Sequence, residues 1–292
     1  MRLGGSVFYH GTDAEEFALA HVAKGFGAAI CPPWLSLERP RELEAFKKAM
    51  KKHDVVIAEV GVWNNPLHPD RAEAERNIGK LAERLRLAEE LGAATCVNIL
   101  GTRQTASWFG PEKGNYSDDF FEEAVEVSQR VIDQVKPERT RLSFEMMPYC
   151  FLDSPEEYLR FLKAVDREAA GVHLDICNNM NSPRRFYNNA AYIRHTFQLL
   201  GDKIVTLHLK DIDLKEDALT VAFEEVLLGT GGIDHVTLME EISRLPADTP
   251  AILEHLETEE QYDQAAKAAE RFAEKAGMRR DGLVWRTARK SH

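Results

Sequence analysis

Residues 142–175 read LSFEMMPYCFLDSPEEYLRFLKAVDREAAGVHLD, and this stretch contains the repeating unit of the chain. It begins with a short apolar run that ends at Glu145 and closes with a second run that ends at Asp175. Between them, Ser154-Pro155-Glu156-Glu157 is typical of a helix start, because proline suits the first helical position and acidic residues favour the positive end of the helix dipole. The stretch therefore predicts a strand, a helix over 154–165 and a second strand.

The same alternation continues on both sides of this unit. Segments with helical spacing and many charges, at 69–92, 117–135 and 257–276, separate short apolar runs. We expect eight strands, at 7–9, 28–31, 55–60, 94–100, 141–145, 171–175, 204–209 and 251–254. Strict alternation of strand and helix favours a parallel sheet with helices outside. Eight such units in about 276 residues predict the α/β class and a closed (β/α)8 TIM barrel.

An open, doubly wound sheet is the main rival fold, and it normally carries a glycine-rich turn after an early strand. The chain has no G-x-G-x-x-G motif, and we interpret Gly229-Thr230-Gly231-Gly232 as a late loop. We expect one barrel domain over residues 1–277 and a C-terminal tail over 278–292. Because Val284-Trp285 would be costly to leave in water, the tail is expected to pack on the barrel or on a neighbouring chain.

Composition narrows the function classes. The chain has 48 Asp and Glu residues and 37 Lys and Arg residues, which gives a net charge of −11. Proteins that neutralise the phosphates of nucleic acid usually have an excess of Lys and Arg instead. The four cysteines are scattered and are expected to be reduced thiols. No secretory signal and no apolar run near ~20 residues is apparent. We therefore expect a cytoplasmic protein that binds neither nucleic acid nor a membrane, with a homo-oligomer left open.

The last four expected strands each end in a side chain that can bind a metal ion. These side chains are 30, 33 and 46 residues apart, one strand–helix unit at a time, and strand ends converge on one face of a barrel: Glu145, Asp175, His208 and Glu254. Any one of them alone is more simply a loop residue, a helix cap or a core histidine. Together, three buried carboxylates require a cation. Manganese, cobalt, magnesium and zinc all suit this donor set.

At these residues the chain resembles the xylose-isomerase-like barrels, the sugar phosphate isomerase/epimerase superfamily that includes ketose 3-epimerases and inosose dehydratases. The resemblance runs from about Asn64 to Ala276 and is carried by Ser143-Phe144-Glu145, Val172-His173-Leu174-Asp175, Leu207-His208-Leu209-Lys210-Asp211 and Leu253-Glu254. It implies a divalent ion, manganese first, held by those four ligands. It also implies that Glu145 and Glu254 are the proton-transfer pair, while Asp175 and His208 are ligands only.

The resemblance implies chemistry through an enediol or enolate intermediate. A metal bound to a carbonyl stabilises the negative charge, and two carboxylates remove and return the proton. This predicts a sugar isomerase or epimerase. Alternatives are a lyase acting on a keto sugar, either a dehydratase or an enzyme that cleaves 3-keto-glycosides, and a non-catalytic sugar-binding module. An AP endonuclease is less favoured, because those enzymes use more histidine ligands and several metals.

Substrate contacts are expected on the same rim. We select Asn178, Lys210, Trp63, Asn98, Arg184 and Arg185 as candidate substrate-binding residues. Adjacent arginines can hold a phosphate or carboxylate, although residues 183–187 can equally begin a helix that presents them elsewhere. Trp34, Trp108 and Glu59 are weaker candidates at strand ends, and we expect His173 to be a core or supporting histidine. Asn178 and Leu214 stand where ketose 3-epimerases place a histidine and an arginine, so the sugar itself is not predicted.

Overall fold

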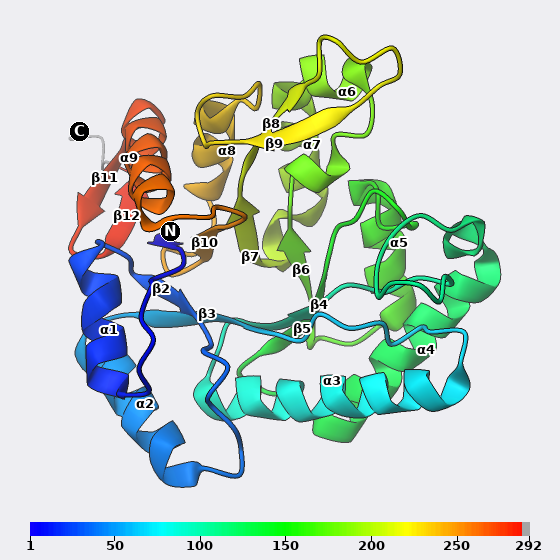
Figure 1. Ribbon diagram of the computed structural model, residues 1–292, viewed down its shortest axis with the longest axis horizontal. Helices are drawn as coiled ribbons and strands as arrows, with labels where there is room; N and C mark the ends of the chain where they lie inside the picture. Colours follow the sequence, from blue (N-terminus) through cyan, green and yellow to red (C-terminus); the bar gives the residue numbers. More distant parts are fainter. Residues whose placement is uncertain (288–292) are drawn as a thin grey trace. The chain divides into compact units, whose positions relative to one another are not determined.

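The structure is a computed structural model that describes residues 1–287. Eight parallel strands close into a barrel in the order β1-β10-β7-β6-β5-β4-β3-β2 (Figure 1). Their bounds are β1 (Arg2–Gly4), β2 (Ala28–Ile30), β3 (Val56–Gly61), β4 (Thr95–Asn98), β5 (Arg141–Glu145), β6 (Ala170–Leu174), β7 (Ile204–Leu209) and β10 (Pro250–Leu253). The expected (β/α)8 TIM barrel is confirmed.

The first expected strand was wrong. Residues 7–9 belong to no strand, and Phe8 is 43% exposed, whereas β1 lies over Arg2–Gly4. Arg2 is buried because its guanidinium pairs with Asp54 Oδ1 at 2.8 Å and with Asp248 Oδ1 at 2.7 Å. A charged residue is tolerated at a buried strand position only with such partners.

The described residues form two compact units. The first contains residues 1–58, residues 180–202 and the described residues from Leu207 onward, so it holds β1, β2, β10 and the second half of β7. The second contains residues 59–179 and 203–206, and it holds β3, β4, β5 and β6. Each unit therefore contributes a run of neighbouring parallel strands.

In the second unit, helices cover one side of the strand run. They are α3 (Arg71–Leu91), α4 (Asp118–Val135) and α5 (Pro155–Val165), with short 3-10 helices η1 (Lys113–Tyr116) and η2 (Cys177–Asn179). Helix α4 packs against both α3 and α5. The predicted start of α5 is confirmed, because the Ser154 side chain accepts a hydrogen bond from the backbone N of Glu157. Tyr158 of α5 is fully buried, and its hydroxyl donates to the Phe144 carbonyl at 2.7 Å, which fixes the helix against β5.

In the first unit, the helices are α1 (Ala14–Ala23), α2 (Pro40–Lys52), α6 (Pro183–Tyr187), α7 (Asn189–Leu200), α8 (His235–Ile242) and α9 (Glu259–Lys275), with η3 (Gly201–Lys203) before β7. Helix α1 packs against α2, and α8 packs against both α7 and α9. An antiparallel hairpin of β8 (Asp211–Leu214) and β9 (Phe223–Val226) follows β7 (yellow in Figure 1). This hairpin was not expected.

The C-terminal segment is structured as far as it is described. Strands β11 (Met278–Asp281) and β12 (Val284–Thr287) form an antiparallel hairpin beside α9 (Figure 1). Trp285 is 4% exposed, and its backbone N donates to the Met1 carbonyl at 2.8 Å. The expected tail thus packs on the first unit of its own chain, and its last residues, 288–292, lie outside the described part. Among the described helices, none has both the length and the apolar character needed to cross a bilayer.

Candidate metal centre

Two candidate ligands lie at neighbouring strand ends in the second unit. Glu145 is the last residue of β5, Asp175 follows β6 directly, and both are buried. Asn178 in η2 binds both carboxylates: its backbone N donates to Asp175 Oδ1 at 2.9 Å, and its side-chain Nδ2 donates to Glu145 Oε1 at 3.1 Å. Asn178 therefore fixes the orientation of the pair.

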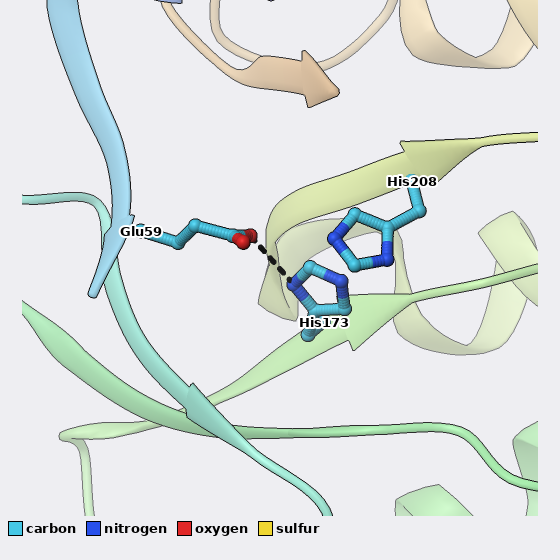
Figure 2. A group of neighbouring side chains, drawn as sticks. All are labelled: Glu59, His173 and His208. Carbon is cyan, nitrogen blue, oxygen red and sulfur yellow. Dashed lines mark ion pairs between the residues drawn. The ribbon is translucent and has the colours of Figure 1, made fainter. Parts of the chain in front are cut away.

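His173 lies two residues before Asp175 in β6 and is fully buried. Its Nδ1 lies 2.6 Å from the Thr206 hydroxyl and 3.7 Å from Glu59 Oε2, the ion pair drawn as a dashed line in Figure 2. Glu59 is also buried, at the middle of β3. Both side chains therefore lie within the strand layer, the position expected of a supporting histidine.

The other two candidate ligands lie on paired strands of the first unit. His208 of β7 is in register with Ile252 of β10, two residues before Glu254. Glu254 Oε1 lies 2.8 Å from His208 Nδ1 and 2.8 Å from Lys210 Nζ. Burial raises the pKa of the Glu254 carboxyl, but the neighbouring His208 and Lys210 outweigh burial and hold that pKa below its usual range. Glu254 is therefore ionised and can accept a cation.

His255 and Glu225 add a further pair of charges beside Glu254, and sequence reasoning missed both. His255 has a positive φ of 57°, and its Nε2 lies 3.7 Å from Glu254 Oε2. Its Nδ1 lies 2.8 Å from Glu225 Oε2 on β9, and this hydrogen bond raises the pKa of His255. The signal that could have indicated Glu225 was the apolar–polar alternation Asp-Ile-Asp-Leu at 211–214, which is typical of a hairpin strand.

The predicted rim residues of the second unit have defined neighbours. Asn98 is buried and bonds to Asn64 twice: its Nδ2 donates to Asn64 Oδ1 at 2.8 Å, and its Oδ1 accepts from the Asn64 backbone N at 2.9 Å. This joins the residues after β3 to the end of β4. Trp63, with a positive φ of 50°, lines one pocket together with Trp108 and Asn64.

The two predicted arginines lie on helix α6, whose N-cap is Ser182. Arg184 is exposed, and the Arg185 guanidinium lies 4.7 Å from the centre of the Tyr192 ring. The helical alternative for this segment is therefore confirmed, and one of the two arginines stacks on α7. Their contact with a substrate stays a prediction.

Comparisons with known proteins assign the chain to a family. A model of the family described as xylose isomerase-like TIM barrel matches residues 20–274. A comparison with curated sequences gives no match.

Solved structures resemble the fold at low identity. A xylose isomerase-like TIM barrel protein from Mycobacterium smegmatis, in complex with magnesium, is 17% identical with a TM-score of 0.66, over 94% of this chain and 96% of that one. D-psicose 3-epimerase from Clostridium cellulolyticum, solved with D-tagatose, is 16% identical with a TM-score of 0.67, over 94% and 99%. Endonuclease IV from Thermus thermophilus is 16% identical with a TM-score of 0.71, over 94% and 100%. At these identities the likeness shows the fold alone, so the expected absence of nucleic acid stays a prediction.

Proposed function

Because this chain belongs to the xylose isomerase-like TIM barrel family, we propose that it is a divalent-metal-dependent sugar isomerase or epimerase. Its ligands would be Glu145, Asp175, His208 and Glu254, with the two glutamates as the proton-transfer pair. Sugar epimerases are among the proteins that share its fold, which supports this reaction class.

The observation that carries the proposal is that each unit places two metal-competent side chains at the ends of neighbouring strands. The second unit supplies the carboxylates of Glu145 and Asp175, both bonded to Asn178, and the first unit supplies His208 and Glu254, whose Nδ1 and Oε1 atoms lie 2.8 Å apart. A buried carboxylate costs several kcal/mol unless a cation offsets it. A set of three carboxylates, one of them in contact with Lys210, and one imidazole fits a divalent ion such as manganese, cobalt, magnesium or zinc. The magnesium complex of a protein with the same fold supports this choice of ion class.

In this proposal the side chains have different roles: some transfer protons, and others hold the proton-transfer groups in position. When bound, a divalent ion supplies Lewis-acid polarisation of a substrate carbonyl. Glu145 and Glu254 extend from β5 and from the end of β10, and each can remove or return a proton at a carbon beside that carbonyl. Asn178 orients Glu145, and Lys210 holds Glu254 ionised through their 2.8 Å contact. Epimerisation requires two such groups, one on each side of the reacting carbon.

Metal binding is tested with the two ligands that carry no proton in the proposal. We expect wild-type protein purified with manganese to hold about one ion per chain, and Asp175→Ala and His208→Ala to lose it, since neighbouring polar groups do not hold an ion once direct ligands are removed. Elemental analysis measures this occupancy. The matched control is His10→Ala, an exposed histidine outside the proposed ligand set. Unchanged occupancy in both ligand variants would refute the site.

Proton transfer is tested at Glu254. Glu254→Gln keeps a ligand oxygen but cannot take a proton, so we expect most of the metal to stay and turnover to fall by about 100-fold. Turnover is measured as deuterium incorporation from D2O into a panel of ketoses, with Glu260→Gln, an exposed neighbour, as control. Wild-type exchange in Glu254→Gln would assign the proton to another residue. Loss of water or of an aglycone during the assay would indicate the lyase alternative.

A further inference from the structure

A cavity of about 260 Å³ adjoins Glu254 within the first unit. It lies between the end of β7, strand β9 with the loop after it, the residues that follow β10, and the start of α9; its polar lining is Lys210, Glu225, Glu254, His255, Glu257 and Gln261. In (β/α)8 barrels the loops after the seventh and eighth strands, together with a helix N-terminus, frequently bind a substrate phosphate. In chain order β7 and β10 are those two strands, so this cavity occupies that place.

The cations that line the cavity are already paired with carboxylates. Lys210 Nζ lies 2.8 Å from Glu254 Oε1 and 3.7 Å from Glu225 Oε1. His255 Nδ1 lies 2.8 Å from Glu225 Oε2. With Glu257 added, three carboxylates line the cavity against these two cations. A phosphate placed here would meet an excess of negative charge.

The helix N-terminus is also engaged internally. The Gln261 side chain accepts hydrogen bonds from the backbone N of Glu257 at 2.7 Å and of Thr258 at 3.1 Å, and Thr258 Oγ1 accepts from the Gln261 backbone N at 3.2 Å. This capping box occupies the backbone N–H groups of Thr258 and Gln261, two of those that would otherwise bind an anion. These N–H groups at the start of α9 therefore already have acceptors within the chain and do not need a phosphate.

On the premise of the isomerase or epimerase function above, we propose that this cavity receives an uncharged, hydroxyl-bearing end of the substrate and excludes a phosphate ester. Sugar hydroxyls can donate hydrogen bonds to the carboxylates of Glu225 and Glu257, which act only as acceptors when ionised. A phosphate dianion has no proton to donate and is repelled by the same groups. The substrate class that follows is an unphosphorylated sugar.

Paired probes test the substrate class. D-fructose and D-fructose 6-phosphate, and D-ribulose and D-ribulose 5-phosphate, are compared in the manganese-loaded enzyme by deuterium incorporation from D2O. Since placing like charges together costs several kcal/mol, we expect kcat/KM for the free sugar of at least one pair to exceed that of its ester by about 100-fold. An ester used as well as its free sugar would overturn the proposal. Exchange with none of the four sugars would count against the proposed function. The exclusion of phosphate esters from the cavity would then be tested by the binding measurement alone.

Binding of D-fructose 6-phosphate, measured by isothermal titration calorimetry, needs no turnover. We expect the wild type to bind the ester more weakly than D-fructose, and Glu257→Gln and Glu225→Gln/Glu257→Gln to bind it about tenfold more tightly than the wild type. Glu259→Gln/Glu260→Gln removes the same charge from residues that do not line the cavity, so it should leave the affinity closer to that of the wild type. Equal affinity in the wild type and in all the variants would show that the cavity carboxylates exclude nothing and would overturn the assignment.

Discussion

Asn178 illustrates how one residue can serve two proposed ligands through different atoms. Its backbone N holds Asp175, and its side-chain amide holds Glu145. An alanine at this position keeps the first hydrogen bond and removes the second. The residue thus separates the contribution of a supporting hydrogen bond from the contribution of the ligands themselves.

We expect Asn178→Ala to weaken manganese binding by about tenfold, because residues that orient ligands usually contribute that much to metal affinity. Calorimetric titration of the metal-free protein with Mn²⁺ measures the change. Asn181→Ala is the matched control, since Asn181 is exposed in the same segment. A manganese affinity that stays at the wild-type value in Asn178→Ala would show that the amide does not support the centre.

The candidate ligands could be predicted from the sequence because each stands at the end of an apolar run, where a barrel has its functional face. The role of Asn178 was harder to predict: its type and position suggested a substrate contact, whereas its side chain bonds to Glu145. The pairing of Glu225 with His255 was missed, because the alternation at 211–214 indicates a hairpin strand but not the partners of its residues. Its members are 30 residues apart, and one of them lies on a hairpin whose presence was not expected.

At the scale of elements, the β8–β9 hairpin is fastened to the loop that follows it by one buried carboxylate. Asp211, the first residue of β8, accepts hydrogen bonds from the backbone N of Gly229 at 2.9 Å and of Gly231 at 3.0 Å, and His235 Nε2 lies 3.3 Å away. Burial raises the pKa of Asp211, but His235 and these amides outweigh burial and lower it overall. Gly231 is required here, because a Cβ would lie 2.4 Å from the Ile212 carbonyl oxygen.

We expect Asp211→Asn to lower the free energy of unfolding by about 2 kcal/mol, since hydrogen bonds to a charged group contribute about 1.5–3 kcal/mol and the amide group accepts with one oxygen only. Urea denaturation measures this loss. Asp213→Asn, two residues along the same strand and exposed, should change the stability little. Equal stability of the two variants would mean that Asp211 does not fasten the loop.

Most strands could be placed from apolar runs, and β1 shows the limit of that method. The segment Arg2-Leu3-Gly4 is short, begins with a charge and ends with glycine, so it lacks a strand pattern. Its partners Asp54 and Asp248 are far away in sequence, and local periodicity contains no information about them. The more apolar residues 7–9 were chosen instead, although they lie in the loop that follows β1.

At the scale of the whole molecule, a buried histidine makes stability depend on pH. His21 of α1 packs against Phe17, and its Nδ1 donates to the Phe17 carbonyl at 2.9 Å. Burial lowers the pKa of His21 from 6.5 to about 4. The folded chain therefore keeps this ring neutral at pH values where the unfolded chain binds a proton. The resulting loss of stability grows as pH falls from about 6.5 to about 4, and it is complete below the folded pKa.

We expect the free energy of unfolding of the wild type to fall by about 2 kcal/mol more than that of His21→Leu between pH 7.5 and pH 5, from one-site proton linkage. Urea titrations of both proteins at the two pH values give this difference, and groups common to both proteins cancel. His21→Gln, which is also neutral at both pH values, should behave like His21→Leu. Parallel losses in the wild type and the variants would show that His21 does not contribute to acid sensitivity.

The parallel pairing of β1 with β10, with Arg2 opposite Pro250, has a consequence for the newly made chain. A ribosome adds about 5–20 residues per second, so β1 waits roughly 12–50 s for its partner to be synthesised. The second unit is made almost continuously, over residues 59–179, and its strands β3 to β6 can pair with one another within that interval. During translation the side of β1 that later pairs with β10 is therefore left unpaired. This strand edge is where we expect aggregation to begin or a chaperone to bind first.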